Sequence, residues 1–319
     1  MANVYRVGKG SAHGKIILAG EHAVVHRQPA IALPFSSVQI TVCIKSQNRH
    51  LGQRTPQVSM QSAYYSGDFF SEHQHLKGIQ AIWHAFFKQY SYCEPDVQIK
   101  IDSTIPPERG MGSSAALATA FTRSLFDYFD EPLDEATLDK YTSISEKIAH
   151  GNPSGIDQQI VKSSQAIYFR KNESPRPFDF SLPGHLVIAD TGQIGNTREA
   201  VSDVARLLEE NPEQTNQWII HIGKIVDQMM TSIKDQDVEK LGQLMNENHH
   251  YLQKLTVSND LLDKLVKNAL ASGALGAKLT GGGRGGCMIA LADSAQSAEK
   301  IASHLKKIGA VSTWLLSLE

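Results

Sequence analysis

The segment Pro-Pro-Glu-Arg-Gly-Met-Gly-Ser-Ser-Ala-Ala, residues 106–116, carries the strongest signal for both fold and chemistry. Gly110 and Gly112 allow a tight turn and a close approach of the backbone to a ligand. Ser113 is expected to cap the Ala-rich helix that follows. The start of such a helix binds phosphate, because its first N–H groups lack internal partners and the helix dipole is positive there. Ser114 adds a hydroxyl that suits Mg²⁺ bound between phosphates.

Three alternative interpretations of this segment follow from the residues alone. The same residues suit an ordinary capped helix start. A Walker P-loop is excluded, because no Lys precedes the Ser pair. Gly110, Gly112 and Ala115 also fit the G-x-G-x-x-A pattern of a dinucleotide site, but residues 106–109 separate them from the preceding strand. The segment by itself leaves a phosphate-binding loop and a plain helix start open.

The hydrophobic pattern around this loop predicts a mixed α+β protein. Apolar residues alternate at Val38, Ile40, Val42 and Ile44, as in a half-buried strand. Residues 46–75 are polar and are interpreted as an exposed excursion. Helices are expected at about 76–90, 113–129, 134–149 and 294–307 and through most of 197–272, with strands in 4–45 and near 97–101, 165–170, 185–190, 287–291 and 310–316. A Pro-containing turn region at 174–183 predicts two domains, 1–183 and 184–319.

A second chemical signal is Glu-Lys-Ile-Ala-His-Gly-Asn-Pro-Ser-Gly-Ile-Asp, residues 146–157. Glu146 is expected in the last turns of a helix that Gly151 ends. Asn152-Pro153 then predicts a turn, after which Ser154 caps a short helix carrying Asp157. One of the two acids can hold Mg²⁺ while the other accepts a proton from an attacking hydroxyl. The alternative that the residues leave open is that Glu146 pairs with a surface lysine and that Asp157 only supports the start of the second helix.

The apolar segment from Gly14 to Val25 begins with Lys15. A lysine at this position either pairs with Asp157 and steadies phosphoryl charge, or extends to solvent at the strand end. Glu21 and His22 follow Gly20 in a turn, where a histidine serves structure or ligand binding.

A third glycine-rich segment, Lys278 to Gly286, precedes a strand. Its glycines allow close backbone packing near phosphates or against the first glycine loop, and a flexible hairpin turn is the alternative. Thr197 and Arg198 open a long helix, where Arg198 either grips a substrate carboxylate or is solvated.

The overall composition narrows the class of partner. The 319 residues hold 31 Lys and Arg against 33 Asp and Glu, a net charge of −2 that gives no electrostatic case for nucleic acid or an anionic membrane. Residues 1–10 contain no apolar stretch typical of a secretory signal, so a cytoplasmic protein is expected. Cys43, Cys93 and Cys287 are far apart and are expected to be reduced thiols of the core.

Taken in order, the Lys-bearing strand, the G-x-G-S-S-A loop and the late glycine loop resemble the GHMP small-molecule kinases, over most of the chain from Lys15 to Gly286. The resemblance implies a two-domain α+β fold, with an N-terminal phosphate-loop domain and a C-terminal ferredoxin-like domain. It also implies ATP as co-substrate and Mg²⁺ as cofactor. Segments 20–26 and 150–157 are most similar to the members that act on mevalonate, which implies mevalonate and ATP as partners of a monomer or homodimer.

The resemblance also assigns roles to residues of this chain. Asp157 becomes the catalytic base or orienting group, with Lys15 as its charge partner, and Ser114 and Glu146 become Mg²⁺ ligands. The implied ATP-binding residues are Pro106, Pro107, Glu108, Arg109, Gly110, Met111, Gly112, Ser113, Ser114, Ala115 and Ala116. The implied substrate-binding residues are Glu21, His22, Ser154, Thr197, Arg198 and Gly283. Arg284 departs from the family pattern, which has Gly or Ser at this place.

Three rival functions are compatible with parts of the sequence. One is a kinase for another alcohol, such as phosphomevalonate or a sugar. Another is a catalytically silent relative that binds ligands, although such a protein is expected to lose Lys15, Glu146 or Asp157. The last is a nicotinamide-dependent oxidoreductase built on the G-x-G-x-x-A pattern.

Overall fold

A computed structural model describes residues 5–48, 55–151 and 153–319, which form two compact units. Unit 1 comprises Met1–Gly14, Val38–Pro106 and Gly112–Pro153. Unit 2 comprises Lys15–Ser37, Pro107–Met111 and Ser154–Glu319. The chain therefore passes between the units several times, and the loop at 106–116 contributes residues to both. The domain boundary near residue 183 stays a prediction.

Unit 1 contains a sheet whose central pairing joins β2 (Ala30–Ser46) to β5 (Val97–Ser103). The last part of β2, from Ile40 to Ser46, runs antiparallel to β5. The order continues through β3 (Val58–Gln61), parallel to β5, to β4 (Ser66–Asp68), while β1 (Val7–Ala19) pairs with β2. Alternate residues of β5 are buried, as the period-2 pattern predicts.

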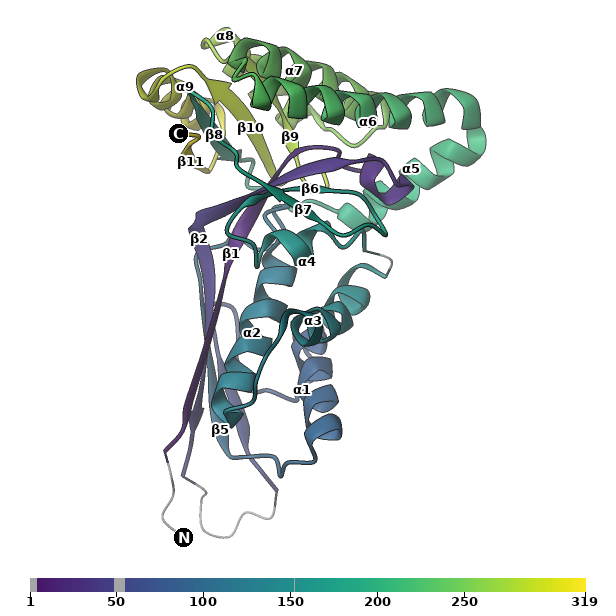
Figure 1. The fold of residues 1–319 in the computed structure, drawn as a ribbon. Coiled ribbons are helices and arrows are strands. Elements are labelled where there is room, and N and C mark those ends of the chain that lie inside the picture. The colour runs from purple at the N-terminus through teal and green to yellow at the C-terminus, as the bar shows by residue number, and fades with distance from the viewer. Residues whose placement is uncertain (1–4, 49–54, 152) are drawn as a thin grey trace. The chain divides into compact units, whose positions relative to one another are not determined.

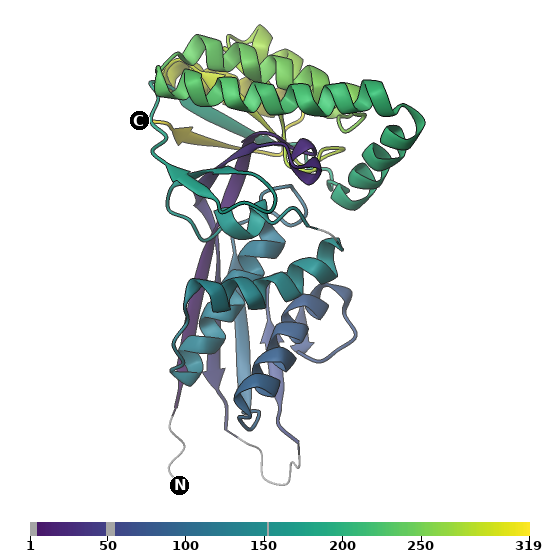
Figure 2. The ribbon, with the colours of Figure 1, turned by 45° about the vertical axis from the view of Figure 1, so that its right-hand side comes forward.

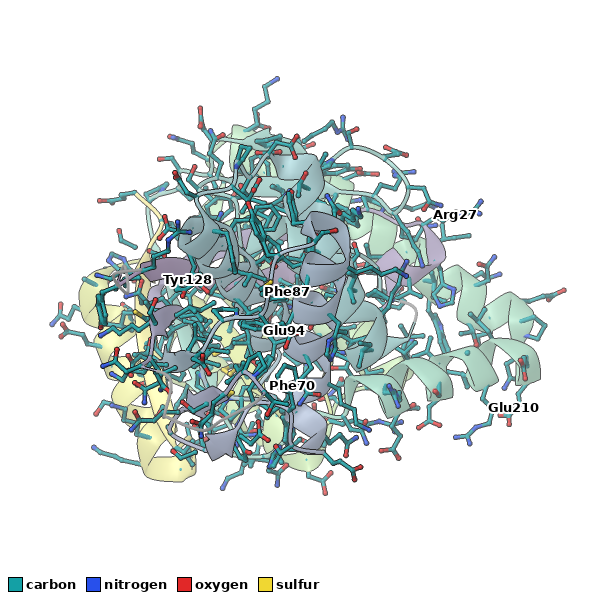
Figure 3. All side chains as sticks on the ribbon, turned by 90° about the horizontal axis from the view of Figure 1, so that it is seen from below. Arg27, Phe70, Phe87, Glu94, Tyr128 and Glu210 are labelled. Carbon is teal, nitrogen blue, oxygen red and sulfur yellow. The ribbon has the colours of Figure 1, made fainter. Side chains whose placement is uncertain are left out.

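Three helices pack together on one side of these strands: α1 (Lys77–Tyr90), α2 (Ser113–Phe129) and α3 (Glu135–His150) (Figures 1 and 2). Aromatic side chains fill the core between the helices. The rings of Trp83 and Phe87 lie 4.7 Å apart, and Phe70, labelled with Phe87 in Figure 3, meets Trp83 edge-on. A Cβ on Gly10 would lie 2.1 Å from the Ala120 carbonyl oxygen, so this glycine lets β1 approach α2 closely.

Unit 2 contains a four-stranded antiparallel sheet in the order β11-β8-β10-β9. The strands are β8 (His185–Asp190), β9 (Gly276–Thr280), β10 (Cys287–Ala292) and β11 (Ser312–Ser317). The helices α5 (Thr197–Glu210), α6 (Pro212–Lys234), α7 (Val238–Lys254) and α8 (Asp260–Ala271) separate β8 from β9, and α9 (Ala295–Ile308) separates β10 from β11 (Figure 1). This succession confirms the expected ferredoxin-like arrangement.

Unit 2 also holds several smaller elements, among them the helix that carries Asp157. The 3₁₀ turn η1 (Ala23–His26) belongs to unit 2, whereas the 3₁₀ turn η2 (Gln74–Leu76) belongs to unit 1. The helix α4 (Ile156–Ile160) is followed by β6 (Ala166–Phe169) and β7 (Arg176–Phe178). The start of β2 pairs with β6, and β6 pairs with β7. Buried apolar residues of β1, η1, β2, α4 and β6 form one core cluster.

Most expected helices and strands are confirmed, and the differences have local causes. The excursion at 46–75 contains β3 and β4. Val58 and Met60 of β3, which pairs with β5, are buried although their neighbours in the sequence are polar. β7 and β9 were not expected. Residues 49–54 of that excursion, and Asn152 of the predicted turn, lie outside the described residues. Among the described residues, no helix has the length and hydropathy to cross a bilayer.

The predicted helix caps were displaced by one residue. Gly112 (φ 77°), not Ser113, is the N-cap of α2, and Gly155 (φ 91°), not Ser154, is the N-cap of α4. Both helices begin from a left-handed residue, which favours glycine over serine. The three cysteines are free, but only Cys287 is buried, so the expected core position is wrong for the other two.

Candidate active site

Lys15 and Asp157 form an ion pair in unit 2, with 2.9 Å between Lys15 Nζ and Asp157 Oδ1. The lysine lies within β1 and its side chain is 3% exposed, whereas 34% of the Asp157 side chain is exposed. Asp157 occupies the first turn of α4, to which the left-handed Gly155 leads the chain. The pair thus joins a buried cation to a carboxylate that solvent or a substrate can reach.

Residues 107–111 of the first glycine loop are fixed within the same unit. The backbone N–H of Lys15 donates to the Met111 carbonyl at 3.1 Å, and the Gly195 N–H donates to the Glu108 carbonyl at 2.9 Å. Arg109 lies with its Nε 3.1 Å from Asp190 Oδ1, and its guanidinium donates to the Gly192 carbonyl at 2.8 Å. The Arg109 side chain therefore anchors the loop to the end of β8.

The late glycine loop, residues 281–286, turns between β9 and β10 and packs against the first one. A Cβ on Gly281 would lie 2.9 Å from the Gly110 Cα, and a Cβ on Gly286 would lie 2.8 Å from the Arg109 carbonyl oxygen. Both glycines have positive φ, at 81° and 72°. Of the two sequence interpretations, close packing against the first loop and a hairpin turn, the structure contains both.

Glu21 and Lys278 form a second ion pair, which is sealed from solvent. Their side chains are 2% and 0% exposed, and Lys278 Nζ also donates to the Leu279 carbonyl at 2.7 Å. Burial raises the pKa of Glu21 and lowers the pKa of Lys278, and each opposes the shift of the other. Among the described residues, Glu21 Oε2 has no hydrogen-bond partner.

His22 lies beside this pair in a left-handed conformation, with φ 61°. Its Nε2 donates to the Gly282 carbonyl at 3.0 Å, so the tautomer with a proton on Nε2 satisfies the contact. Burial lowers the pKa of His22 to about 4, so the ring is neutral at pH 7. Thr280 links β9 to β1, because its hydroxyl accepts a hydrogen bond from the Ile17 N–H at 3.0 Å and donates one to the Ile17 carbonyl at 2.9 Å.

Ser114 and Glu146 meet within unit 1. The Ser114 hydroxyl, in the first turn of α2, donates to Glu146 Oε1 at 2.8 Å. Glu146 lies near the end of α3 and is almost fully buried, with His150 Nε2 at 3.9 Å from its other oxygen. A hydroxyl and a carboxylate are hard oxygen donors of the kind that Mg²⁺ uses together with phosphates and water.

The remaining predicted substrate residues also lie in unit 2. The Ser154 hydroxyl accepts from the Ile156 N–H at 3.4 Å, beside Asp157. Thr197 begins α5 against the late loop, since a Cβ on Gly282 would lie 2.1 Å from Thr197 Oγ1. Arg198 follows it and is exposed. Gly283 (φ 74°) rests on the Val257 carbonyl.

The structure thus brings Lys15 together with Asp157, and Ser114 together with Glu146, as sequence reasoning expected. The sequence did not indicate the contacts that Lys278, Thr280 and Asp190 make around the site. An acid ending the apolar run of β8 was a weak signal for Asp190. A lysine within β9 gave no sign of its partner, because Glu21 is 257 residues away in the sequence.

Comparison with known proteins places the chain in a family. Residues 77–164 match the model of the GHMP kinases N terminal domain, and residues 229–311 match that of the GHMP kinases C terminal domain. The mevalonate kinase of Pyrococcus horikoshii is 33% identical, over 97% of each chain. The chain therefore belongs to the GHMP kinases and is an ATP-dependent small-molecule kinase.

Two solved structures extend the comparison. The L. major mevalonate kinase in complex with R-mevalonate has a TM-score of 0.80 and 28% identity, covering 98% of this chain and 96% of that one. The mevalonate kinase from methicillin-resistant Staphylococcus aureus MRSA252 has a TM-score of 0.72 and 34% identity, covering 98% and 99%.

Proposed function

We propose that this kinase transfers the γ-phosphoryl group of ATP to the C5 hydroxyl of (R)-mevalonate, giving ADP and 5-phosphomevalonate in the mevalonate route to isoprenoids. Relatives and structural neighbours named mevalonate kinase, matching nearly the whole chain, support this substrate. The observation that carries the chemistry is the Lys15–Asp157 pair, which presents a partly exposed carboxylate on a buried cation. A cytoplasmic location, and a monomeric or homodimeric state, belong to the same proposal.

The proposed reaction centre is the Asp157 carboxylate. The C5 oxygen attacks the γ-phosphorus while the bond from that phosphorus to the β-phosphate oxygen breaks, and ADP leaves with the bonding electrons. Asp157 orients the hydroxyl and takes its proton. Lys15, held 2.9 Å from Asp157, keeps that carboxylate in place and offsets negative charge near the transferred group.

Ser114 and Glu146 fit Mg²⁺ as a pair of hard oxygen ligands within hydrogen-bond distance of each other. When bound, the ion neutralises charge on the phosphates and favours departure of ADP. The rest of loop 106–116 is proposed to bind ATP, with the N–H groups at the start of α2 directed at phosphate oxygens. The Arg109 side chain contributes indirectly, because its contacts with Asp190 and Gly192 hold the loop.

The carboxylate end of mevalonate is assigned to the start of α5. Thr197 offers a hydroxyl and Arg198 a guanidinium, which matches a carboxylate through paired N–H donors. His22, Ser154 and Gly283 are proposed to complete the substrate site. A neutral His22 suits this role, since its pKa of about 4 leaves the ring as a hydrogen-bonding group rather than a cation. Glu21, which is 2% exposed and paired with Lys278, is proposed to hold this site in place without touching the substrate.

Purified protein assayed with Mg-ATP against a panel of alcohols tests the proposal. The panel contains (R)-mevalonate, (S)-mevalonate, phosphomevalonate, homoserine and galactose, and ADP formation is followed. The Asp157→Asn variant, purified in the same way, controls for contaminating kinases. We expect turnover with (R)-mevalonate alone at physiological concentrations. Faster turnover with any other member of the panel would overturn the substrate assignment while leaving the kinase class intact.

A further inference from the structure

Arg284 is the one position of the late glycine loop at which this chain carries a long side chain between glycines. Its φ is 55°, in the left-handed region that a non-glycine residue occupies at a cost. Glycine would fill this position without strain, so the contacts of the arginine side chain have to offset that cost.

The Arg284 side chain joins three segments of unit 2. Its Nε and one terminal nitrogen each donate to the Thr256 carbonyl at 3.2 Å, in the connection between α7 and α8. Its other terminal nitrogen pairs closely with Asp203 Oδ2 and lies 3.7 Å from Glu199 Oε1, both on α5. The Arg284 backbone N–H donates to the Val257 carbonyl at 2.8 Å. The guanidinium is 23% exposed and Asp203 is 19% exposed, so water screens the pair only partly.

Glu199 and Asp203 are four residues apart and therefore lie on one face of α5. Fixing that face to the glycine loop fixes the rotation of the helix about its axis. The rotation in turn sets the direction of Thr197 and Arg198, which occupy the first turn. Thr197 is already in contact with the neighbouring Gly282. The loop and the start of α5 are thus held together at two points.

We propose that Arg284 is a positioning residue that orients α5 so that Thr197 and Arg198 meet the substrate carboxylate. The inference rests on the proposed function, which assigns these two residues to that carboxylate. It predicts that loss of the Arg284–Asp203 contact weakens substrate capture without disturbing phosphoryl transfer.

Steady-state kinetics of Arg284→Gly, Asp203→Asn and the double variant test this inference. For each variant we expect the KM for mevalonate to rise roughly three- to tenfold, the effect of losing a partly buried ion pair. The KM for ATP and kcat should stay within about twofold, and the double variant should be no worse than either single variant, because both remove one contact. Arg206→Gln is the matched control, since Arg206 pairs with the other oxygen of Asp203 at the exposed surface, 66% exposed. That variant should keep the wild-type KM.

Unchanged mevalonate KM in both Arg284→Gly and Asp203→Asn, or an equal rise in the KM for ATP, would overturn the inference. If Arg284→Gly does not fold, Asp203→Asn decides alone. Arg198→Ala separates the two levels of the proposal. If it leaves the mevalonate KM unchanged, the carboxylate assignment fails; if it raises that KM while the Arg284 and Asp203 variants do not, only the positioning role fails.

Discussion

Two pairs of unit 2 each join a buried lysine to a carboxylate, and they differ in the exposure of that carboxylate. Lys278 and Glu21 are sealed, at 0% and 2% exposed, whereas Lys15 is buried and its partner Asp157 is 34% exposed. Desolvation shifts the pKa of both members of the sealed pair towards the neutral form, so its attraction has to offset a large loss of hydration. The sealed pair suits a structural role, because both of its side chains are almost completely buried.

The open pair suits chemistry for the converse reason. An exposed carboxylate edge can exchange its water for a substrate hydroxyl, while the buried lysine stays in place. A lysine and a carboxylate therefore serve different purposes in the two pairs, and the burial of the carboxylate decides which purpose.

The largest effect is expected at the open pair. Asp157→Asn removes the proposed base and should lower kcat by about 100- to 10,000-fold, because positioned proton transfer is worth that much. ATP binding, measured by calorimetry, should remain close to wild type. Near-normal turnover in this variant would exclude Asp157 from the mechanism.

Substitutions at the sealed pair should change the free energy of unfolding. Lys278→Met leaves Glu21 buried without its partner and should lower the free energy of unfolding by about 3–5 kcal/mol, measured by urea denaturation. Lys240→Met, at an exposed position of α7, should change stability by less than about 0.5 kcal/mol. Combining Lys278→Met with Glu21→Gln should recover part of the loss. A Lys278→Met protein of wild-type stability would show that the pair is not structural.

The smallest effect is expected at the Ser114–Glu146 pair of unit 1. Ser114→Ala and Glu146→Gln should raise the Mg²⁺ concentration for half-maximal activity by roughly tenfold or more, because each removes a hard oxygen ligand. Glu135→Gln, at the exposed start of the same helix α3, is the control and should titrate like wild type. If Ser114→Ala and Glu146→Gln both gave the same Mg²⁺ titration as wild type, the assignment of these residues as Mg²⁺ ligands would be wrong.

Local sequence signals were sufficient where one element decides the outcome. The alternation at Val97, Ile99 and Ile101 predicted β5, and the glycine at position 151 ended α3 where expected. They were insufficient for β3 and for β9. Val58 has polar neighbours, so the pattern did not indicate β3, which its parallel pairing with β5 stabilises. β9 is covered by α7 and α8, and this packing of helices on the strand leaves no mark in its local pattern.

The amino-acid sequence by itself determined the kinase class and the pairing candidates Lys15 with Asp157 and Ser114 with Glu146, because the motifs that carry them are local properties of the chain. The ferredoxin-like arrangement was implied only by the resemblance to the GHMP kinases, since the hydrophobic period did not indicate β9. Only the tertiary structure decided that Glu21 pairs with Lys278, that Arg109 binds Asp190 and that Arg284 reaches α5. Burial and ion pairing depend on which distant segments pack together, and the free energy of a charge is set by that packing rather than by its neighbours in the chain.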